Sequence, residues 1–193
     1  MTLFFALVPD AATLGGLVER RDLLRGQHPT PGRWFDSGRY HLTLHAIGAT
    51  TTAESAWIAK AQAAAGHLRA APFELRIDQA GSFPLKDHVP WWLGCASTPE
   101  PLKQLWRELR DGLKQQGVPL MGSRLTPHLT LIYSAQRDLP QRPVPPLDWP
   151  VRDFVLLQTQ TTADGVSFYA ELGRWALSGR GTSHAPQLDL WDN

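Results

Sequence analysis

Hydrophobic and polar positions alternate strictly in two short stretches of the chain, residues 41–44 and 128–131, and both read His-Leu-Thr-Leu. This alternation is typical of a β-strand with one buried face. We therefore expect the leucines of both copies to lie in the core. His41 and Thr43 then share the opposite face of one strand, and His128 and Thr130 share that of the other.

The hydrophobic pattern around the first copy recurs around the second at an offset of 87 residues, the separation of the two histidines. Apolar runs predict buried strands at 4–7 and 91–94. Segments with helical spacing follow at 11–26 and 99–117, and the second of these begins with a proline and ends with a glycine. The order strand, helix, strand thus occurs twice. It predicts an α+β fold of two lobes related by a pseudo-twofold axis, with the two motifs facing each other across a cleft.

The other segments predict further elements and the extent of the domain. An alanine-rich helix is expected at 51–69, strands are expected at 73–83, 151–160 and 167–172, and the proline-rich residues 141–146 are expected to form a connection. Residues 178–193 are polar and irregular, which indicates a flexible tail. We therefore expect a single bilobed domain over residues 1–177.

Composition narrows the class of protein. Hydrophobic residues make up 42% of the 193 residues, enough for a sizeable core. The net charge of +1 argues against binding to long duplex nucleic acid, but Arg33, Arg39 and Arg124 are near the motifs in sequence and are candidates for a local basic cleft. Cys95 is the single cysteine, and the apolar residues 1–8 are too few to span a membrane and lack a basic leader. We expect a soluble, cytoplasmic monomer.

Two imidazoles and two hydroxyls around one cleft fit phosphoryl transfer between oxygen atoms. This reaction needs a proton removed on one side of phosphorus and a proton supplied on the opposite side, with the two oxygens in line. His41 and His128 are suited to both tasks without a metal, because imidazole titrates near neutral pH. Thr43 and Thr130 are suited to donate hydrogen bonds to the non-bridging oxygens, where negative charge accumulates.

Further segments accompany the two motifs in a fixed order along residues 2–177. They are the opening strand 3–7, Trp34 ahead of Tyr40 and the first motif, Gly48 behind it, Gly81 to Pro84 ahead of Trp92-Leu93-Gly94, Thr126-Pro127 ahead of the second motif, and a closing segment from Tyr169 to Leu177. In this arrangement the chain resembles the two-histidine (2H) phosphoesterase superfamily. Within it, the chain is most similar to the bacterial and archaeal RNA 2′,3′-cyclic phosphodiesterases, also known as 2′-5′ RNA ligases.

The resemblance implies a bilobed fold of antiparallel sheets with outer helices, and a reaction at the cleft that needs no metal or other cofactor. The implied reaction opens a 2′,3′-cyclic phosphate on an RNA end or a nucleotide and leaves a 2′-phosphate. Water attacks phosphorus and the 3′ oxygen leaves. His41 and His128 then form the acid/base pair, and Thr43 and Thr130 bind the phosphate. We take His41 as the acid and His128 as the base, but the near-symmetry of the two motifs leaves the reverse assignment open.

The chain departs from the family pattern two residues after the second motif. Family members often carry an arginine there, whereas this chain has Ile132-Tyr133. Tyr133 is a candidate for stacking on a base or for binding phosphate, and Arg124 is a candidate for replacing the arginine.

His45 has no role that the resemblance assigns. Its position four residues after His41 predicts the same strand face, and we expect a structural or surface histidine there. A zinc site formed by His41, His45 and His128 is an alternative, but neither motif contains a carboxylate and no thiolate is near in sequence.

Two other functions use the same cleft. In a non-catalytic binder of RNA ends or nucleotides, Trp34, Phe83 and Tyr133 would stack on bases. In a 2′-5′ RNA ligase, a 5′ hydroxyl would take the place of water. Water is the more abundant nucleophile, so hydrolysis is the leading prediction.

Overall fold

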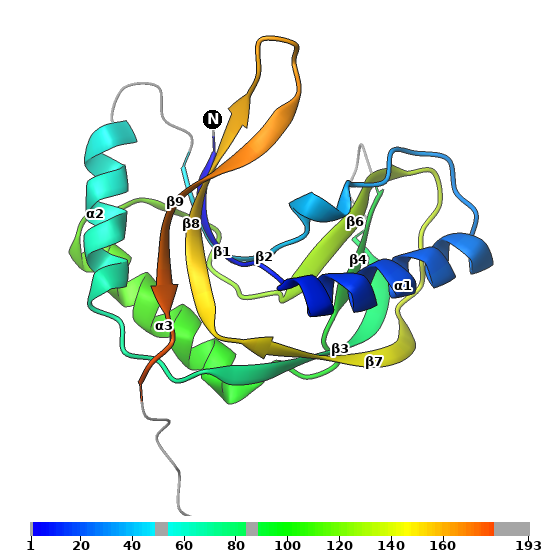
Figure 1. The fold of residues 1–193 in the computed structure, drawn as a ribbon, viewed down its shortest axis with the longest axis horizontal. Helices are drawn as coiled ribbons and strands as arrows, with labels where there is room; N and C mark the ends of the chain where they lie inside the picture. Colours follow the sequence, from blue (N-terminus) through cyan, green and yellow to red (C-terminus); the bar gives the residue numbers. More distant parts are fainter. Residues whose placement is uncertain (1, 49–53, 84–88, 180–193) are drawn as a thin grey trace, which may run out of the picture.

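The computed structural model describes residues 2–48, 54–83 and 89–179 and shows two antiparallel sheets in an α+β fold (Figure 1). Sheet A has the strand order β5 (Leu120–Met121), β2 (Leu42–Ile47), β1 (Leu3–Leu7), β8 (Asp153–Thr161) and β9 (Ser167–Ala176). Sheet B has the order β6 (His128–Ala135), β4 (Val89–Gly94), β3 (Phe73–Ser82) and β7 (Arg142–Val151). The predicted fold class is confirmed.

Helices cover the outer sides of the two sheets (Figure 1). Helix α1 (Ala11–Gln27) packs against β7 of sheet B, whereas α2 (Glu54–Gly66) and α3 (Glu100–Gln115) pack against each other and against sheet A. Asp10 caps α1, because its carboxylate accepts a hydrogen bond from the Thr13 amide at 2.8 Å. Pro99 precedes α3 and Gly117, with φ of 68°, follows it, as the sequence predicted.

The repeat expected from the sequence is present in the fold. The units β1–α1–β2 and β4–α3–β6 have the same order, and within each unit the two strands pair antiparallel. The helix of each unit packs against the sheet of the other unit, since α1 contacts β7 and α3 contacts β2. The two halves are therefore interlocked.

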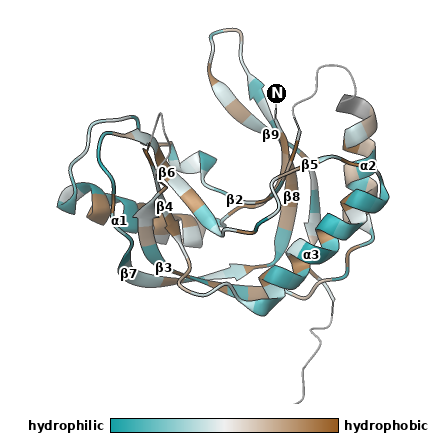
Figure 2. Cartoon of the chain, turned by 180° about the vertical axis from the view of Figure 1, so that it is seen from behind, coloured by the Kyte–Doolittle hydropathy of each residue, from teal (hydrophilic) through white to brown (hydrophobic). Residues whose placement is uncertain are grey.

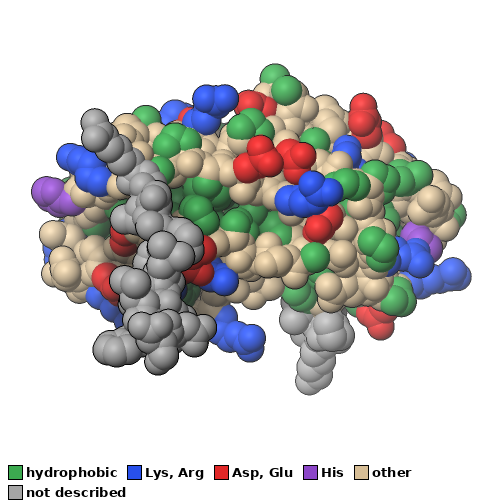
Figure 3. Space-filling model, turned by 90° about the horizontal axis from the view of Figure 1, so that it is seen from below, with side chains coloured by type: hydrophobic (Ala, Val, Ile, Leu, Met, Phe, Trp, Pro, Cys, Tyr) green, Lys and Arg blue, Asp and Glu red, His purple; other side chains and the backbone are tan. Residues whose placement is uncertain are grey.

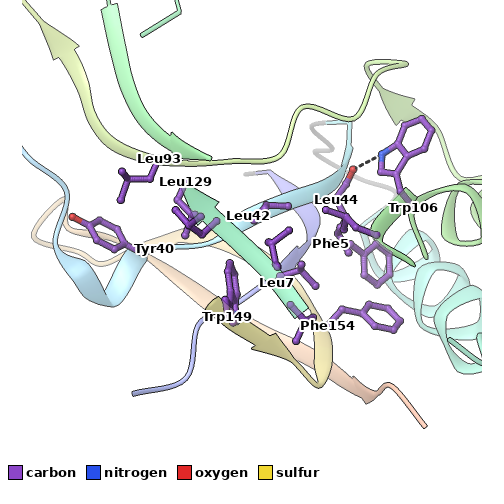
Figure 4. Close-up of a cluster of buried hydrophobic side chains, with 14 of the residues drawn as sticks. Phe5, Leu7, Tyr40, Leu42, Leu44, Leu93, Trp106, Leu129, Trp149 and Phe154 are labelled. Atoms are coloured by element: carbon purple, nitrogen blue, oxygen red, sulfur yellow. Dashed lines mark hydrogen bonds between the residues drawn. The ribbon is translucent and has the colours of Figure 1, made fainter. Parts of the chain in front are cut away.

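The core is built from the apolar faces of both sheets. Leu42, Leu44, Leu129 and Leu131 of the two motifs are at most 4% exposed. Figure 4 shows Leu42 and Leu129 in one cluster with Trp149 of β7. In Figure 2 the outward side of α3 is mainly hydrophilic, and its buried residues form the predicted stripe: Leu102, Leu105, Trp106, Leu109 and Leu113. Burial of the four motif leucines fixes which face of each strand is left for His and Thr.

The proline-rich residues 141–146 were predicted to form a connection, and this prediction is wrong. All but the first of them belong to β7, which pairs with β3 at the edge of sheet B. An edge strand leaves part of its amide groups without a partner strand, so prolines are tolerated there. A sequence rich in proline therefore hides a strand of 10 residues.

Other boundaries differ by a few residues. The helix predicted at 51–69 is α2, Glu54–Gly66, and residues 51–53 of that prediction lie outside the described residues. Val151 ends β7 rather than starting β8, and β9 extends to Ala176. Of the predicted tail, residues 178 and 179 are described, and the amide of Gly179 donates to the Ala70 carbonyl at 2.9 Å; residues 180–193 lie outside the described residues.

The surface carries mixed charge. On the face shown in Figure 3, Lys and Arg side chains are interspersed with Asp and Glu. No helix in the described ranges is long and apolar enough to cross a membrane. Cys95 is half-buried, and burial raises the pKa of its thiol to about 12.

Candidate active site

The two motifs lie on neighbouring strands of different sheets. His41 directly precedes β2 of sheet A, and His128 is the first residue of β6 of sheet B. β2 and β6 are in contact, and the two imidazoles are close enough for the charge on His128 to lower the pKa of His41. With the motif leucines buried, His41 and Thr43 project from β2 on the opposite side, and His128 and Thr130 do the same from β6. The structure thus brings together the four residues that the sequence singled out.

Each histidine forms the same kind of hydrogen bond, from its Nδ1 to the backbone carbonyl oxygen two residues before it. Nδ1 of His41 is 2.8 Å from the carbonyl oxygen of Arg39, and Nδ1 of His128 is 2.7 Å from that of Thr126. A carbonyl oxygen only accepts, so Nδ1 carries the proton in each ring. Nε2 is then the nitrogen that gains or loses a proton, and it has no protein hydrogen-bond partner within the described ranges.

The surroundings favour the neutral form of both imidazoles. Burial lowers the pKa of His41 and of His128, because a charged ring loses hydration when it is buried. His41 also feels the positive charges of His128 and Arg39, which lower its pKa further. The interaction between the two histidines is mutual, so Arg39 is the cation at His41 that has no counterpart among the causes at His128.

Aromatic rings flank each imidazole. The His41 ring is 5.0 Å from the rings of both Phe4 and Tyr169, measured between centroids. The His128 ring meets Phe83 edge to face at 4.9 Å, and Phe83 stacks on Trp92 at 5.4 Å. These contacts restrict the orientation of each imidazole and reduce its access to water.

Two glycines let the Trp92 indole lie flat against sheet B. A Cβ at Gly81 would be 2.7 Å from the Trp92 ring, and one at Gly94 would be 2.7 Å from the carbonyl oxygen of Pro127. Gly94 pairs with His128 across β4 and β6. The close approach at Gly94 therefore sets the position of the backbone that leads into His128.

The other predicted binding residues divide into two groups. Phe83 lies at the site through its contact with His128. Tyr133 is 49% exposed on β6, five residues after His128. Trp34 instead packs edge to face on Trp91 at 5.9 Å and forms a bridge to Ile132, which gives it a structural role.

Of the three arginines expected to form a basic cleft, one lies at the site. Arg39 has its guanidinium over the ring of Tyr169, which also contacts His41. Arg33 and Arg124 are exposed, and the described part of the structure gives neither a contact with the two histidines.

The prediction that His45 shares a strand face with His41 is wrong. The pairing of β1 with β2 shifts between Phe5, which pairs with His45, and Ala6, which pairs with Thr43. This β-bulge reverses the alternation and turns His45 into the core, where it is 3% exposed. It is the structural histidine that the sequence suggested.

His45 contacts α3 and does not lie beside His41. Its Nε2 is 2.8 Å from the Trp106 carbonyl oxygen, and its ring stacks on the Trp106 indole with 4.8 Å between centroids. The indole Nε1 in turn donates to the Leu44 carbonyl at 2.9 Å (Figure 4). The zinc site of three histidines that the sequence left as an alternative is therefore not assembled, because His45 points to the opposite side of sheet A.

Comparison with known families and structures agrees with this geometry. The model of the 2′-5′ RNA ligase superfamily matches residues 19–163. The chain therefore belongs to the 2′-5′ RNA ligase superfamily. Comparison of the sequence with curated proteins gives no match.

Solved structures of this superfamily share the fold over nearly the whole chain. LigT of E. coli without ligand is 28% identical, with a TM-score of 0.73, over 92% of this chain and 97% of LigT. LigT in complex with 3′-AMP is 29% identical, with a TM-score of 0.71, over 91% and 96%. TT0787 of Thermus thermophilus is 25% identical, with a TM-score of 0.71, over 93% and 99%. The resemblance to 2H phosphoesterases that the sequence suggested is confirmed.

Three aromatic residues at the site were not among the predicted ones. Phe4 and Tyr169 reach His41 only through the pairing of β1 with β2 and β8 and of β8 with β9, which is not a local property of the sequence. The sequence did carry a signal for Trp92, which lies between Gly81 and Gly94 in the apolar run that matches residues 4–7 of the first half. Its pairing with Thr130 places it beside the second motif.

Proposed function

We propose that this protein opens 2′,3′-cyclic phosphates at RNA ends or on nucleotides to give 2′-phosphates, without a metal. One observation carries the proposal: two imidazoles on adjoining strands, each fixed through Nδ1 and each with a threonine two residues further on the same strand face. Membership of the 2′-5′ RNA ligase superfamily supports it, and so does the structure of the relative LigT in complex with 3′-AMP.

The reaction requires two proton transfers and one displacement at phosphorus. Water forms the new P–O bond and gives a proton to Nε2 of one histidine, while the bond from phosphorus to the 3′ oxygen breaks and that oxygen takes a proton from Nε2 of the other. The hydroxyls of Thr43 and Thr130 donate to the non-bridging oxygens. The two imidazoles supply both proton transfers, so no step depends on a metal.

The charges around the site bear on which histidine is the acid. From the sequence, His41 is the expected acid and His128 the expected base, with the reverse assignment left open. The repulsion between the two imidazoles acts equally on both, but the charge of Arg39 disfavours an imidazolium at His41, and no arginine is among the causes that lower the pKa of His128. We therefore assign the proton of the free enzyme to His128, which makes His128 the acid and His41 the base for ring opening.

Ligation is the second candidate function, because the family name and the site both allow it. A 5′ hydroxyl in place of water would give its proton to the same base and form a 2′-5′ linkage. The third candidate function is binding of RNA ends or nucleotides without catalysis. It would not need two imidazoles with free Nε2 atoms, so the site favours an enzyme. A cytoplasmic location and a monomeric state remain predictions.

The test is incubation of chelator-treated protein with an RNA oligonucleotide that ends in a 2′,3′-cyclic phosphate. Mass and sensitivity to phosphatase and periodate identify a 2′-phosphate end, and an added acceptor with a 5′ hydroxyl reveals ligation. His41→Ala and His128→Ala should each lower turnover by at least roughly 100-fold, the size of general acid or base assistance. His67→Ala, which removes an exposed histidine beyond α2, is the control and should retain wild-type turnover.

The pH dependence of the two variants distinguishes the acid from the base. Loss of the base removes the limb on which the rate rises with pH, and loss of the acid removes the limb on which it falls. We expect His41→Ala to lack the rising limb. Near-normal turnover in either alanine variant would exclude that histidine from the mechanism, and an unchanged substrate with the wild type would refute the proposed reaction.

A further inference from the structure

Arg39 lies in an aromatic setting at the edge of the site. Its guanidinium carbon is 5.1 Å from the ring centroid of Phe35 and 4.9 Å from that of Tyr169. One terminal nitrogen donates to the Tyr169 hydroxyl at 3.1 Å. Its Nε is buried and has no hydrogen-bond partner in the described part of the chain. The side chain is thus held in place with one N–H donor still unsatisfied.

Arg39 lies beside His41, the first of the two catalytic candidates. Tyr40 has extended backbone angles, φ of −69° and ψ of 126°, and its side chain is 2% exposed in the core. His41, the next residue, therefore projects to the other side. Arg39 is the last residue of the short 3₁₀-helix η1 (Ser37–Arg39), which leads through Tyr40 and His41 into β2. Tyr169 contacts both Arg39 and His41, which places the guanidinium beside the imidazole.

The charge of Arg39 has no carboxylate partner within the described ranges. Arg174, by contrast, binds Asp153 and Glu171 at 2.6 Å each, and Arg107 binds Glu100. An uncompensated cation near His41 disfavours the imidazolium there. An anion of the substrate that reaches a terminal nitrogen of the guanidinium would compensate this charge, whereas the buried Nε is not accessible to it.

The position of Arg39 indicates which anion this is. In the proposed reaction the two histidines and two threonines surround the cyclic phosphate. The guanidinium carbon of Arg39 and the ring of His41 lie 4.9 and 5.0 Å from the ring centroid of Tyr169, so they are at most about 10 Å apart. Neighbouring phosphates of a single RNA strand fit within this distance. We propose that Arg39 binds the phosphate on the 5′ side of the terminal nucleotide, so that the preferred substrate is an RNA end or a 5′-phosphorylated nucleotide. This inference rests on the proposed function.

The test compares two substrates that differ only in this phosphate. They are adenosine 2′,3′-cyclic phosphate with a 5′ hydroxyl and the same nucleotide with a 5′-phosphate. For the wild type, kcat/KM should be higher with the 5′-phosphate by roughly tenfold to a hundredfold, the contribution of a hydrogen bond to a charged group. Arg39→Gln should reduce this preference to less than about threefold, mainly through KM, and Arg39→Lys should restore part of it, because lysine keeps the charge without the planar donors.

Arg107→Gln is the matched control, because Arg107 lies on α3, which packs on the other side of sheet A, and is paired with Glu100. It should keep the full preference. A wild type with equal kcat/KM for the two substrates would overturn the inference. So would an Arg39→Gln variant that loses the same factor with both substrates, since Arg39 would then act on the cyclic phosphate or on the fold.

Equilibrium binding separates this inference from the proposed reaction. Calorimetry with adenosine 2′-phosphate and adenosine 2′,5′-bisphosphate measures the same preference without turnover. If the wild type opens neither cyclic substrate but prefers the bisphosphate, and Arg39→Gln abolishes that preference, the Arg39 site stands and the proposed reaction fails. If the wild type opens both cyclic substrates but shows no preference in rate or in binding, the proposed reaction stands and the Arg39 site fails.

Discussion

Gly94→Ala tests whether the packing of sheet B positions His128. The added Cβ would be 2.7 Å from the Pro127 carbonyl oxygen and 3.2 Å from the Trp92 ring, whereas ordinary contact begins at 3.4 Å. The carbonyl belongs to the backbone and cannot rotate away as a side chain does. Relief of about 0.7 Å, the difference between 3.4 and 2.7 Å, must therefore come from a shift of β4 against the segment 126–128.

We expect Gly94→Ala to lower both kcat and the free energy of unfolding. Thr126 supplies the carbonyl that holds His128, so a shift of this segment moves the imidazole with it. A misplacement of 1 Å can cost about a hundredfold in rate, so a shift of several tenths of an ångström should lower kcat by roughly tenfold or more. Overpacking should lower the free energy of unfolding by roughly 1–3 kcal/mol, which leaves a typical domain folded.

The assay is the kcat for opening a 2′,3′-cyclic phosphate, combined with denaturant unfolding of the same preparation. Gly15→Ala is the matched control, because a Cβ at Gly15 in α1 meets nothing within 4 Å. It should keep wild-type kcat and gain roughly 0.5–1 kcal/mol, as expected for Gly to Ala within a helix. A folded Gly94→Ala variant with wild-type kcat would refute the claim that this contact fixes His128.

Three further predictions concern pH and the attachment of α3. Burial lowers the pKa of both His41 and His128, so kcat/KM should be highest below a pH of about 6.5. Removal of the positive charge in Arg39→Gln should raise the pKa of His41 and move the limb of the pH profile that belongs to His41 to higher pH. A wild-type optimum well above pH 7 would contradict this prediction. His41, His45 and His128 all have a lower pKa in the folded chain than the ordinary 6.5, so the unfolded chain binds more protons below 6.5. Their contribution to the free energy of unfolding should be fully present above a pH of about 6.5 and fall as pH drops below it, before carboxylates titrate, as measured by denaturant titrations at several pH values. Trp106→Phe leaves the buried Leu44 carbonyl without its donor and should lower the free energy of unfolding by roughly 1–3 kcal/mol. Each kcal/mol should lower Tm by roughly 2–4 °C. Trp57→Phe is the control and should change Tm much less, because the described structure gives no hydrogen bond for Trp57.

Local patterns were sufficient to predict the elements that carry the site. Alternation around His41 and His128 predicts a strand with leucines inside, and burial of those leucines leaves no other arrangement for the histidines. Proline before α3, glycine after it and an apolar stripe between them predict its ends to within two residues. These signals depend on residues that are close in sequence, which is why they succeed.

The errors arose where distant parts of the chain decide the outcome. The bulge that turns His45 away from His41 is a property of the register between β1 and β2, and alternation within one strand does not reveal it. The prolines of β7 are compatible with a strand only because β7 is an edge, which depends on the strand order of sheet B. The contact of Tyr169 with His41 likewise requires the order of strands in sheet A.

The repeat explains both the likeness and the difference of the two histidines. Each is fixed by the carbonyl two residues before it, so the duplicated strands give both imidazoles the same tautomer. A symmetrical pair would share one proton equally, however, and directional catalysis needs one base and one acid. The residue at the matching position before each motif breaks the symmetry, since the first half has Arg39 where the second has Thr126. In the proposed mechanism the charge of Arg39, which has no counterpart before the second motif, biases the proton toward His128, and we infer that the same side chain binds a second phosphate.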